Sequence, residues 1–338
     1  MDSMSYNRPK LIVITPVRNE AWVLKAFLTH CSSWADHIII ADHYSTDGSR
    51  EIASHFPKVT LIDNPCREWV EYRCRARLLE EVSHIAGDKI IFALDADEFL
   101  SEGFEHTKGW QKIIESEPNE IFYFNWLNIY GNYNHADIID IRSEWVAHYS
   151  GDIDIVDEYL KQEKQAVHCS RVPCLEATRC KYTYINDIYF THLANINSRR
   201  VRNKLDFYQV VNMDKNPNKA NPINLYRSYY QQLHHTAPHL NSPIKICTMN
   251  GSQTLNTLVQ NSDNGQHYID EMIRIFQREG YEKFMPLCIW DNPDLLAAGI
   301  NCLPPLPLHI LHWYLKSTQK KYQSLPIRII DKLLKYVV

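Results

Sequence analysis

Two aspartates separated by one residue, Asp95 and Asp97, are the strongest chemical signal in the sequence. They follow an apolar run at residues 89–94 of the kind that forms a buried strand. Hard divalent cations such as Mg²⁺ and Mn²⁺ prefer carboxylate oxygens together with substrate phosphates. A second copy of the pattern, at residues 152–154, is interpreted as a solvent-exposed loop. The position of the first copy at a strand end therefore favours a metal site there.

The elements that must position these residues alternate between strand and helix. Short apolar runs predict strands at 11–15, 38–42, 59–62 and 89–94, and helical spacing predicts helices at 19–34, 47–56 and 68–85. Uninterrupted apolar strands are typical of a mostly parallel sheet that helices cover on both faces. Ligands of such sheets bind beyond the carboxyl ends of the strands. Asn19, Glu20, Asp42 and the pair Asp95 and Asp97 all stand at those predicted ends.

The pattern changes after residue 100. Residues 120–195 read as strands and irregular loops, and eight aromatic residues fall between 121 and 150. We interpret these aromatic residues as a strand packed against the core, with a sugar-binding platform as the alternative. From residue 197 onward the sequence predicts helices, with breaks near 214–222, 238–252, 290–293 and 303–307.

Three segments together carry a resemblance to a known family: Thr15-Pro16-Val17-Arg18-Asn19-Glu20, Ala41-Asp42-His43-Tyr44-Ser45-Thr46-Asp47-Gly48-Ser49 and Leu94-Asp95-Ala96-Asp97-Glu98. Their order and spacing resemble the motifs of family 2 glycosyltransferases. The resemblance implies a GT-A type nucleotide-sugar-binding fold, with a mostly parallel central sheet flanked by helices and a helical C-terminal extension. We expect a glycosyltransferase domain at 1–213, with a donor half at 1–100 and an acceptor half at 101–213, followed by the extension at 214–338.

The resemblance also implies roles for individual residues. Donor contacts are expected from Thr15, Arg18, Asn19, Glu20, Asp42, Asp95 and Ala96. Asp97 would be the main ligand of a Mn²⁺ or Mg²⁺ ion, which Asp95 would also contact. Asp47 would shape its loop, and a simple helix N-cap is the alternative role.

Basic residues and one histidine complete the expected donor site. Arg73 and Arg77 share one face of the helix predicted at 68–85, and Arg77 matches the family arginine better by its spacing. Pairing with acidic residues on the helix surface is the alternative. His192 ends a late predicted strand and could join Asp97 on the metal, and Lys204 on the following helix could meet the diphosphate.

Two features of the site stay open in the sequence. His43 and Tyr44 stand where many family members have an acidic residue and a glycine, which leaves the nucleotide base and the sugar undefined. Transfer with inversion needs a carboxylate as general base, and Asp154 is favoured because its acidic loop follows the aromatic stretch. The other candidates are Glu98, Glu144, Asp152, Asp157, Glu176 and Asp187.

These features predict a metal-dependent glycosyltransferase. It would move a sugar from a nucleoside diphosphate sugar, taken as a UDP-sugar, to a glycan or lipid-linked acceptor in cell-surface polysaccharide biosynthesis. A nucleotidyltransferase is one alternative, although the loop at 16–20 lacks the glycines usual in that class. A non-catalytic glycan-binding relative is the other, and the intact Asp95 and Asp97 pair argues against it.

Composition limits the partners and the location. The 338 residues carry 36 basic and 40 acidic side chains, a net charge of −4 that argues against a nucleic-acid binder. No apolar run reaches the ~18 residues of a membrane span, and no secretory signal is visible at the N-terminus. The nine cysteines are therefore interpreted as reduced thiols of a cytoplasmic protein, and a zinc site around Cys169, Cys174 and Cys180 is disfavoured by their spacing.

The C-terminal 28 residues differ in charge from the rest of the chain. They contain six basic residues and one acid, a net charge of +5, and an apolar stripe of Ile327, Ile330, Leu334 and Val337. A basic amphipathic end of this kind can lie on the inner face of the cell membrane as a peripheral contact. Docking of the same helix on the enzyme is the alternative.

Overall fold

A computed structural model describes the chain over residues 8–64, 70–130, 135–151, 155–162, 169–175, 180–217, 220–230 and 263–336. The described residues form two compact units, the first ending at Ile196 and the second beginning at Asn197. The helix that follows this boundary, α6 (Ser198–Lys215), belongs wholly to the second unit. The structure thus divides the chain before α6, whereas the sequence placed the end of the first domain inside it, at residue 213.

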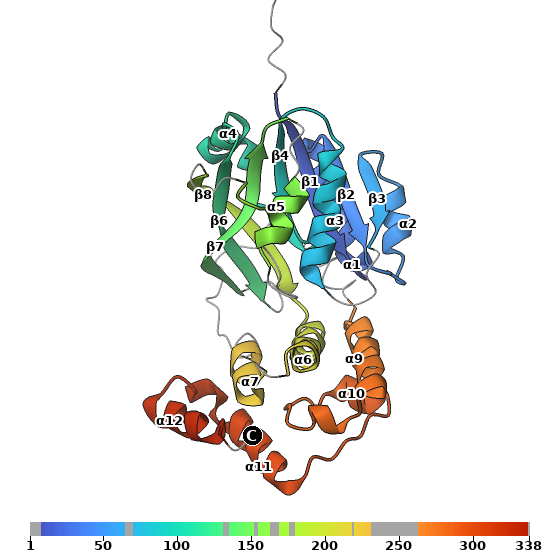
Figure 1. Cartoon of the computed structure of the whole chain (residues 1–338), viewed down its shortest axis with the longest axis vertical. Helices are drawn as coiled ribbons and strands as arrows, with labels where there is room; N and C mark the ends of the chain where they lie inside the picture. The colour runs from blue at the N-terminus through green and yellow to red at the C-terminus, as the bar shows by residue number, and fades with distance from the viewer. Residues whose placement is uncertain are drawn as a thin grey trace, which may run out of the picture. The chain divides into compact units, whose positions relative to one another are not determined.

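An eight-stranded sheet organises the first unit (Figure 1). Its strands, in spatial order, are β3 (Val59–Asp63), β2 (His37–Asp42), β1 (Lys10–Val17), β4 (Lys89–Ala93), β7 (His135–Tyr149), β6 (Glu120–Tyr130), β8 (Lys181–Asn195) and β5 (Glu98–Leu100). The first four strands of this order are parallel, as predicted. β7 is antiparallel to both β4 and β6, β8 is parallel to β6, and β5 is antiparallel to β8.

Helices cover both faces of the sheet because its central strands are apolar on both faces. On β1, Leu11 and Val13 join one buried cluster, and Ile12 and Ile14 join the other. The first cluster includes residues of α1 (Ala21–Trp34), α2 (Ser49–Ser54) and α4 (Lys108–Ile114). The second includes residues of α3 (Glu71–Ser83) and α5 (Ile155–Gln162). This two-sided burial confirms the predicted α/β fold.

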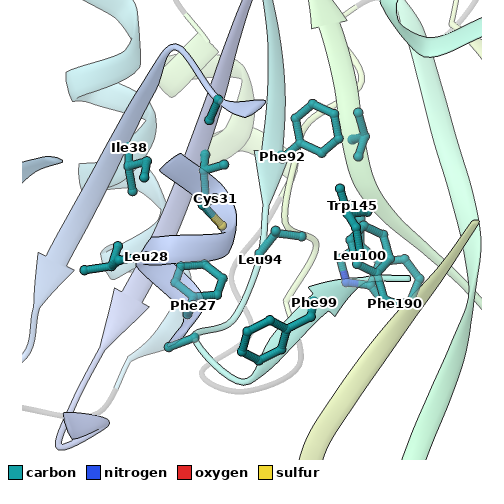
Figure 2. Packing of buried hydrophobic residues seen from close by; sticks show 14 of the residues in the cluster. Phe27, Leu28, Cys31, Ile38, Phe92, Leu94, Phe99, Leu100, Trp145 and Phe190 are labelled. Carbon is teal, nitrogen blue, oxygen red and sulfur yellow. The ribbon is translucent and has the colours of Figure 1, made fainter. Parts of the chain in front are cut away.

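The larger cluster ties the parallel half of the sheet to the antiparallel half. Figure 2 shows Phe27 of α1 beside Phe99, and the two ring centroids lie 6.1 Å apart in an edge-on arrangement. Trp145 and Phe190, from β7 and β8, belong to the same cluster. A short helical turn, η1 (Phe104–His106), follows β5 and adds Phe104 to it.

The aromatic stretch divides between core and surface. Phe122, Phe124, Trp145 and Tyr149 are buried, as expected for a strand packed against the core. Trp126 remains partly exposed and contacts the site described below. The core interpretation is thus confirmed for these four of the eight aromatic residues.

The cysteine prediction needs one correction. Cys174 and Cys180 form a disulfide, with their Cα atoms 6.1 Å apart, whereas the sequence predicted that all the cysteines are reduced thiols. The two cysteines are six residues apart in the sequence and meet in the folded chain, which their spacing alone did not predict. Cys74 and Cys288 are buried thiols, and burial raises the pKa of each to about 12.

Over the described ranges no group of three His, Cys, Asp or Glu residues is placed to hold a metal, so the zinc interpretation gains no support.

The second unit is helical, which confirms the predicted C-terminal extension. Its helices are α6, α7 (Pro222–Tyr230), α9 (Gln266–Glu279), α10 (Pro293–Ala297), α11 (Leu306–Thr318) and α12 (Leu325–Leu334), with short turns η3 (Glu282–Phe284) and η4 (Gln319–Lys321). Ile223 and Tyr226 of α7 pack with Leu311 and Leu315 of α11 in a buried cluster. In the described part of the chain, no helix is both long enough and apolar enough to cross a membrane.

Candidate active site

Hydrogen bonds join the loops that follow β1 and β2. The backbone N–H of Asn19 donates to Ser45 Oγ at 2.9 Å, and Asn19 Oδ1 accepts from the Thr46 N–H at 2.7 Å. Asn19 has a φ of 54°, a left-handed conformation that asparagine tolerates better than most residues. Because these loops lie at the carboxyl ends of neighbouring parallel strands, they form one wall of the expected ligand site.

Asp47 fixes the starts of two helices at once. Its Oδ1 accepts from the backbone N–H of Ser49, at the beginning of α2, and its Oδ2 accepts from the N–H of Ala21, at the beginning of α1. A carboxylate at a helix N-terminus satisfies otherwise unpaired N–H groups. Asp47 therefore acts as a capping and loop-shaping residue. Glu20, a predicted donor residue, accepts instead from the indole N–H of Trp22 at 2.6 Å.

Asp42 ends β2 and is buried with one oxygen unsatisfied. Its Oδ2 accepts from Arg50 Nη1 at 2.9 Å and from the Ser45 N–H at 3.2 Å. Its Oδ1 is buried and has no hydrogen-bond partner among the described residues. A buried acceptor without a donor costs about 1–3 kcal/mol, which a ligand hydroxyl or amide could recover.

The next two residues, His43 and Tyr44, are the ones that depart from the family motif. His43 is buried, and its Nδ1 accepts from the Asn64 amide at 2.7 Å. Tyr44 is exposed and has a φ of 54°, so the turn is left-handed at a position where a glycine would be unstrained. The turn thus adopts the left-handed conformation with a tyrosine at this position, and the tyrosine ring lies at the surface of the loop.

Asp95, the first residue of the Asp-x-Asp pattern, is held by two guanidinium groups. Arg75 Nη2 of α3 donates to Oδ1 at 2.8 Å, and Arg171 Nη2 donates to Oδ2 at 2.8 Å. Although burial favours the neutral form of Arg75, Asp95 and Glu71 hold its pKa well above the usual value. Both oxygens of Asp95 therefore accept from arginines, and its expected contact with a cation stays a prediction.

Glu98 links the same pattern to β6. Both of its oxygens accept from Arg171, at 2.5 and 2.9 Å, and Oε1 also accepts from the Trp126 indole N–H at 3.1 Å. The backbone N–H of Asp95 donates to Glu98 Oε2 at 2.9 Å. Burial raises the pKa of Glu98 to about 7, although Arg171 favours the charged form. Enclosed by these partners, Glu98 is unsuited to act as a base on an acceptor.

Asp97 and His192 form the pair best suited to a cation. Asp97 Oδ2 lies 3.8 Å from His192 Nε2, and the Asp97 carbonyl accepts from the Leu193 N–H at 2.9 Å. His192 Nδ1 donates to Asn128 Oδ1 at 2.6 Å, so the neutral ring keeps its lone pair on Nε2, facing Asp97. Trp126 stacks on the imidazole with ring centroids 4.4 Å apart and fixes its plane. A carboxylate oxygen and an imidazole nitrogen are a donor set that fits Mn²⁺.

Arg75, rather than the predicted Arg77, is the arginine of α3 that reaches the Asp-x-Asp pattern. The predicted contact of Arg77 with the donor stays a prediction. Arg77 pairs with Glu80 at 3.0 Å and with Glu81 at 2.7 Å along the same helix. Arg75 is buried and shares its face of α3 with Leu78, Leu79 and Val82. An arginine inside an apolar helical stripe was the signal that could have identified it.

Arg171 carries no such signal. It lies 76 residues after Asp95 in a segment without regular structure, and its guanidinium stands 5.4 Å from the centroid of the Trp145 ring. Only the folded chain brings it to the Asp-x-Asp pattern.

Four further residues are predicted contacts of the donor: Thr15, Arg18, Ala96 and Lys204. Thr15 and Ala96 are buried, and Arg18 is half-buried in the first loop. Lys204 belongs to the second unit, where its ammonium stands 5.8 Å from the Tyr208 ring, so it is not among the residues that the first unit itself brings together.

The base candidates gain little from the structure. Asp154, the favoured general base, lies outside the described residues, as do Asp152, Glu176 and the side chain of Glu144. Asp187 accepts from the Gly109 N–H at 2.9 Å near the start of α4, a capping role, and Asp157 is exposed on α5.

Comparison with known proteins gives one family match over part of the chain. The model of Glycosyl transferase family 2 matches residues 12–171, which include most of β1, the Asp-x-Asp pattern and Arg171. No curated protein sequence matches significantly.

Solved structures show weak similarity. Mannosyl-3-phosphoglycerate synthase from Rubrobacter xylanophilus is 17% identical, with a TM-score of 0.27, over 35% of this chain and 41% of that one. Glucosyl-3-phosphoglycerate synthase from Mycobacterium tuberculosis is 16% identical, with a TM-score of 0.27, over 35% and 44%. A 4-diphosphocytidyl-2C-methyl-D-erythritol synthase is 12% identical, with a TM-score of 0.35, over 54% and 90%. The match spans less than half the length of the first two proteins.

Proposed function

We propose that this chain, whose residues 12–171 match the model of Glycosyl transferase family 2, is a glycosyltransferase that moves one hexose from a nucleoside diphosphate sugar to a hydroxyl group of a glycan or lipid-linked acceptor. The donor is a UDP-sugar, the transfer inverts the anomeric centre, and the product enters cell-surface polysaccharide synthesis. The protein works on the cytoplasmic side, in peripheral contact with the inner face of the cell membrane.

The nucleoside binds at the loops after β1 and β2. The unsatisfied Oδ1 of Asp42 supports this placement, because a ribose hydroxyl or a base N–H would supply the missing donor. Arg50 holds the other oxygen of Asp42 and keeps the carboxylate oriented. Thr15, Arg18, Asn19 and Glu20 form the first loop of this pocket, and Lys204 remains a proposed contact to the diphosphate.

Asp97 and His192 hold a Mn²⁺ or Mg²⁺ ion. Bound there, the ion would neutralise charge on the departing diphosphate, the Lewis-acid role of metals in such transfers. Asp95 acts mainly by positioning, because Arg75 and Arg171 fix both of its oxygens next to Asp97. Trp126 and Asn128 hold the imidazole of His192 in one orientation and one tautomer. The acceptor hydroxyl loses its proton to a carboxylate, for which Asp154 is our candidate.

The single observation that carries the proposal is the juxtaposition of Asp97 and His192 within a family 2 domain. The test is a panel of nucleotide sugars incubated with the full chain, with and without Mn²⁺, with separate assays for nucleoside diphosphate and pyrophosphate. Cation-dependent release of nucleoside diphosphate is expected for wild type and not for Asp97→Asn. The exposed Glu115→Gln, just after α4, is the matched control and should behave as wild type.

The two alternatives predict different products. A nucleotidyltransferase would consume a nucleoside triphosphate and a sugar phosphate and release pyrophosphate. A non-catalytic relative would bind glycan and release neither product. Undiminished turnover by chelator-treated wild-type enzyme would overturn the metal-dependent mechanism.

A further inference from the structure

Large apolar side chains are concentrated on the surface of α11 and α12. Between residues 303 and 336, nine of them are exposed, against six in the rest of the described chain. On α11 the exposed row contains Leu306, Ile310 and Trp313, which follow helical spacing. Contiguous exposed apolar surface of this kind marks an interaction site in a folded protein.

The position of α12 is fixed by its opposite face. Asp331 accepts from Arg227 Nε at 3.0 Å and from the Tyr314 hydroxyl at 2.8 Å. Leu334 packs against the buried cluster that includes Leu311. The stripe expected from the sequence therefore lies partly on the docked side of the helix, since Leu334 belongs to it, and Val337 lies outside the described residues. Docking of this helix, the alternative considered for it, is present.

A second apolar row on α12 remains exposed. Leu325, Ile329, Leu333 and Tyr336 are spaced by four, four and three residues, and Leu333 has 63% of its surface exposed. Among the described residues the helix is thus docked along one face and exposed along the other, and the docked contacts hold the exposed row in place.

Basic residues run beside this exposed row. Arg328, Lys332 and Lys335 each precede one of its members by a single position, and successive residues of a helix lie about 100° apart around its axis. The only acid between 303 and 336 is Asp331, whose carboxylate is engaged by Arg227. The surface is therefore apolar with a basic border.

We propose that the exposed face of α11 and α12 binds the surface of an anionic lipid bilayer. The apolar rows enter the headgroup boundary, and the residues of the basic border contact lipid phosphates, as in other interfacial helices. Charge favours this occupant over a second copy of the chain, which would bring an equally basic border. The inference deepens the proposed membrane contact and rests on it, but vesicle binding needs no transferase activity.

The test is co-sedimentation of the full chain with vesicles of mixed phosphatidylglycerol and phosphatidylcholine, at low and high salt. Wild type should bind, and binding should weaken with salt and in vesicles of phosphatidylcholine alone. Trp313→Glu with Leu333→Glu should reduce the partition coefficient more than about tenfold. Arg328→Gln and Lys332→Gln should each reduce it roughly fivefold.

Leu296→Glu is the matched control, because Leu296 is exposed on α10 in the same unit. It should bind vesicles as wild type does. Equal pelleting of wild type and the Trp313/Leu333 variant, with circular dichroism showing both folded, would overturn the proposal. A concentration-dependent dimer in light scattering, lost in that variant and without vesicle binding, would assign the face to a second copy. Soluble donor hydrolysis by the same variants reports separately on the proposed function.

Discussion

Arg75, which is buried, and Asp95, which is partly exposed, form an ion pair in which Nη2 of the arginine lies 2.8 Å from Oδ1 of the aspartate. The pair connects α3 to the turn after β4, 20 residues later in the chain. Arg171 donates to the other oxygen of the same carboxylate. The first aspartate of the Asp-x-Asp pattern is thus anchored to the protein, and this anchoring orients the turn that presents Asp97.

Removing Arg75 should destabilise the fold. Arg75→Ala leaves Asp95 with only one of its two arginine partners, and loss of a hydrogen bond to a charged group costs about 1.5–3 kcal/mol in the free energy of unfolding. Denaturant unfolding measures the change. Arg77→Ala on the same helix is the control and should cost less than about 1 kcal/mol, because its pairs with Glu80 and Glu81 are partly exposed. If the two substitutions lower the free energy of unfolding equally, the pair of Arg75 with Asp95 does not stabilise the fold.

Asp42→Asn should weaken binding of the free nucleoside diphosphate. The change removes the charge of the acceptor whose Oδ1 we assign to the ligand, and a hydrogen bond to a charged group contributes about 1.5–3 kcal/mol. Calorimetric titration gives the affinity. Asp63→Asn is a close control, since Asp63 is exposed and accepts from the same Arg50 nitrogen at 2.7 Å. If both variants bind as wild type does, Asp42 does not contact the nucleotide.

His192→Phe should separate metal binding from packing. Phenylalanine can keep the stacking on Trp126 but has no nitrogen to offer a cation. The Mn²⁺ concentration needed for half-maximal donor turnover should rise by at least about tenfold. His148→Phe serves as the control, because His148 is buried and pairs with Ile90 near the start of β4, away from its carboxyl end. An unchanged Mn²⁺ requirement in His192→Phe would leave Asp97 without this partner.

Glu98 should give the stability of the protein a specific pH dependence. Its pKa is raised from 4.5 to about 7 in the folded chain, mainly by burial, so the folded state binds more protons than the unfolded state between those values. The contribution of Glu98 is therefore fully present below pH 4.5 and is lost as pH rises through about 7. Denaturant unfolding of wild type and Glu98→Gln at several pH values measures it. A difference between them that does not vary with pH would contradict the assignment.

The sequence by itself determined the parallel half of the fold and the existence of the Asp-x-Asp turn. Uninterrupted apolar runs such as 11–15 must be buried on both faces, and this local property predicts central strands with polar carboxyl ends before any tertiary contact is known. Helical spacing likewise predicted the helices after residue 197.

Tertiary structure alone decided which charged residues meet that turn. Arg171 reaches Asp95 across 76 residues, and Arg75 rather than Arg77 points inward because a rotation of about 200° separates them on α3. The face of α12 that docks was decided in the same way, by the pairing of Asp331 with Arg227 from another helix. Periodicity shows that a helix has an apolar side, but the partner that covers it comes from a distant part of the chain.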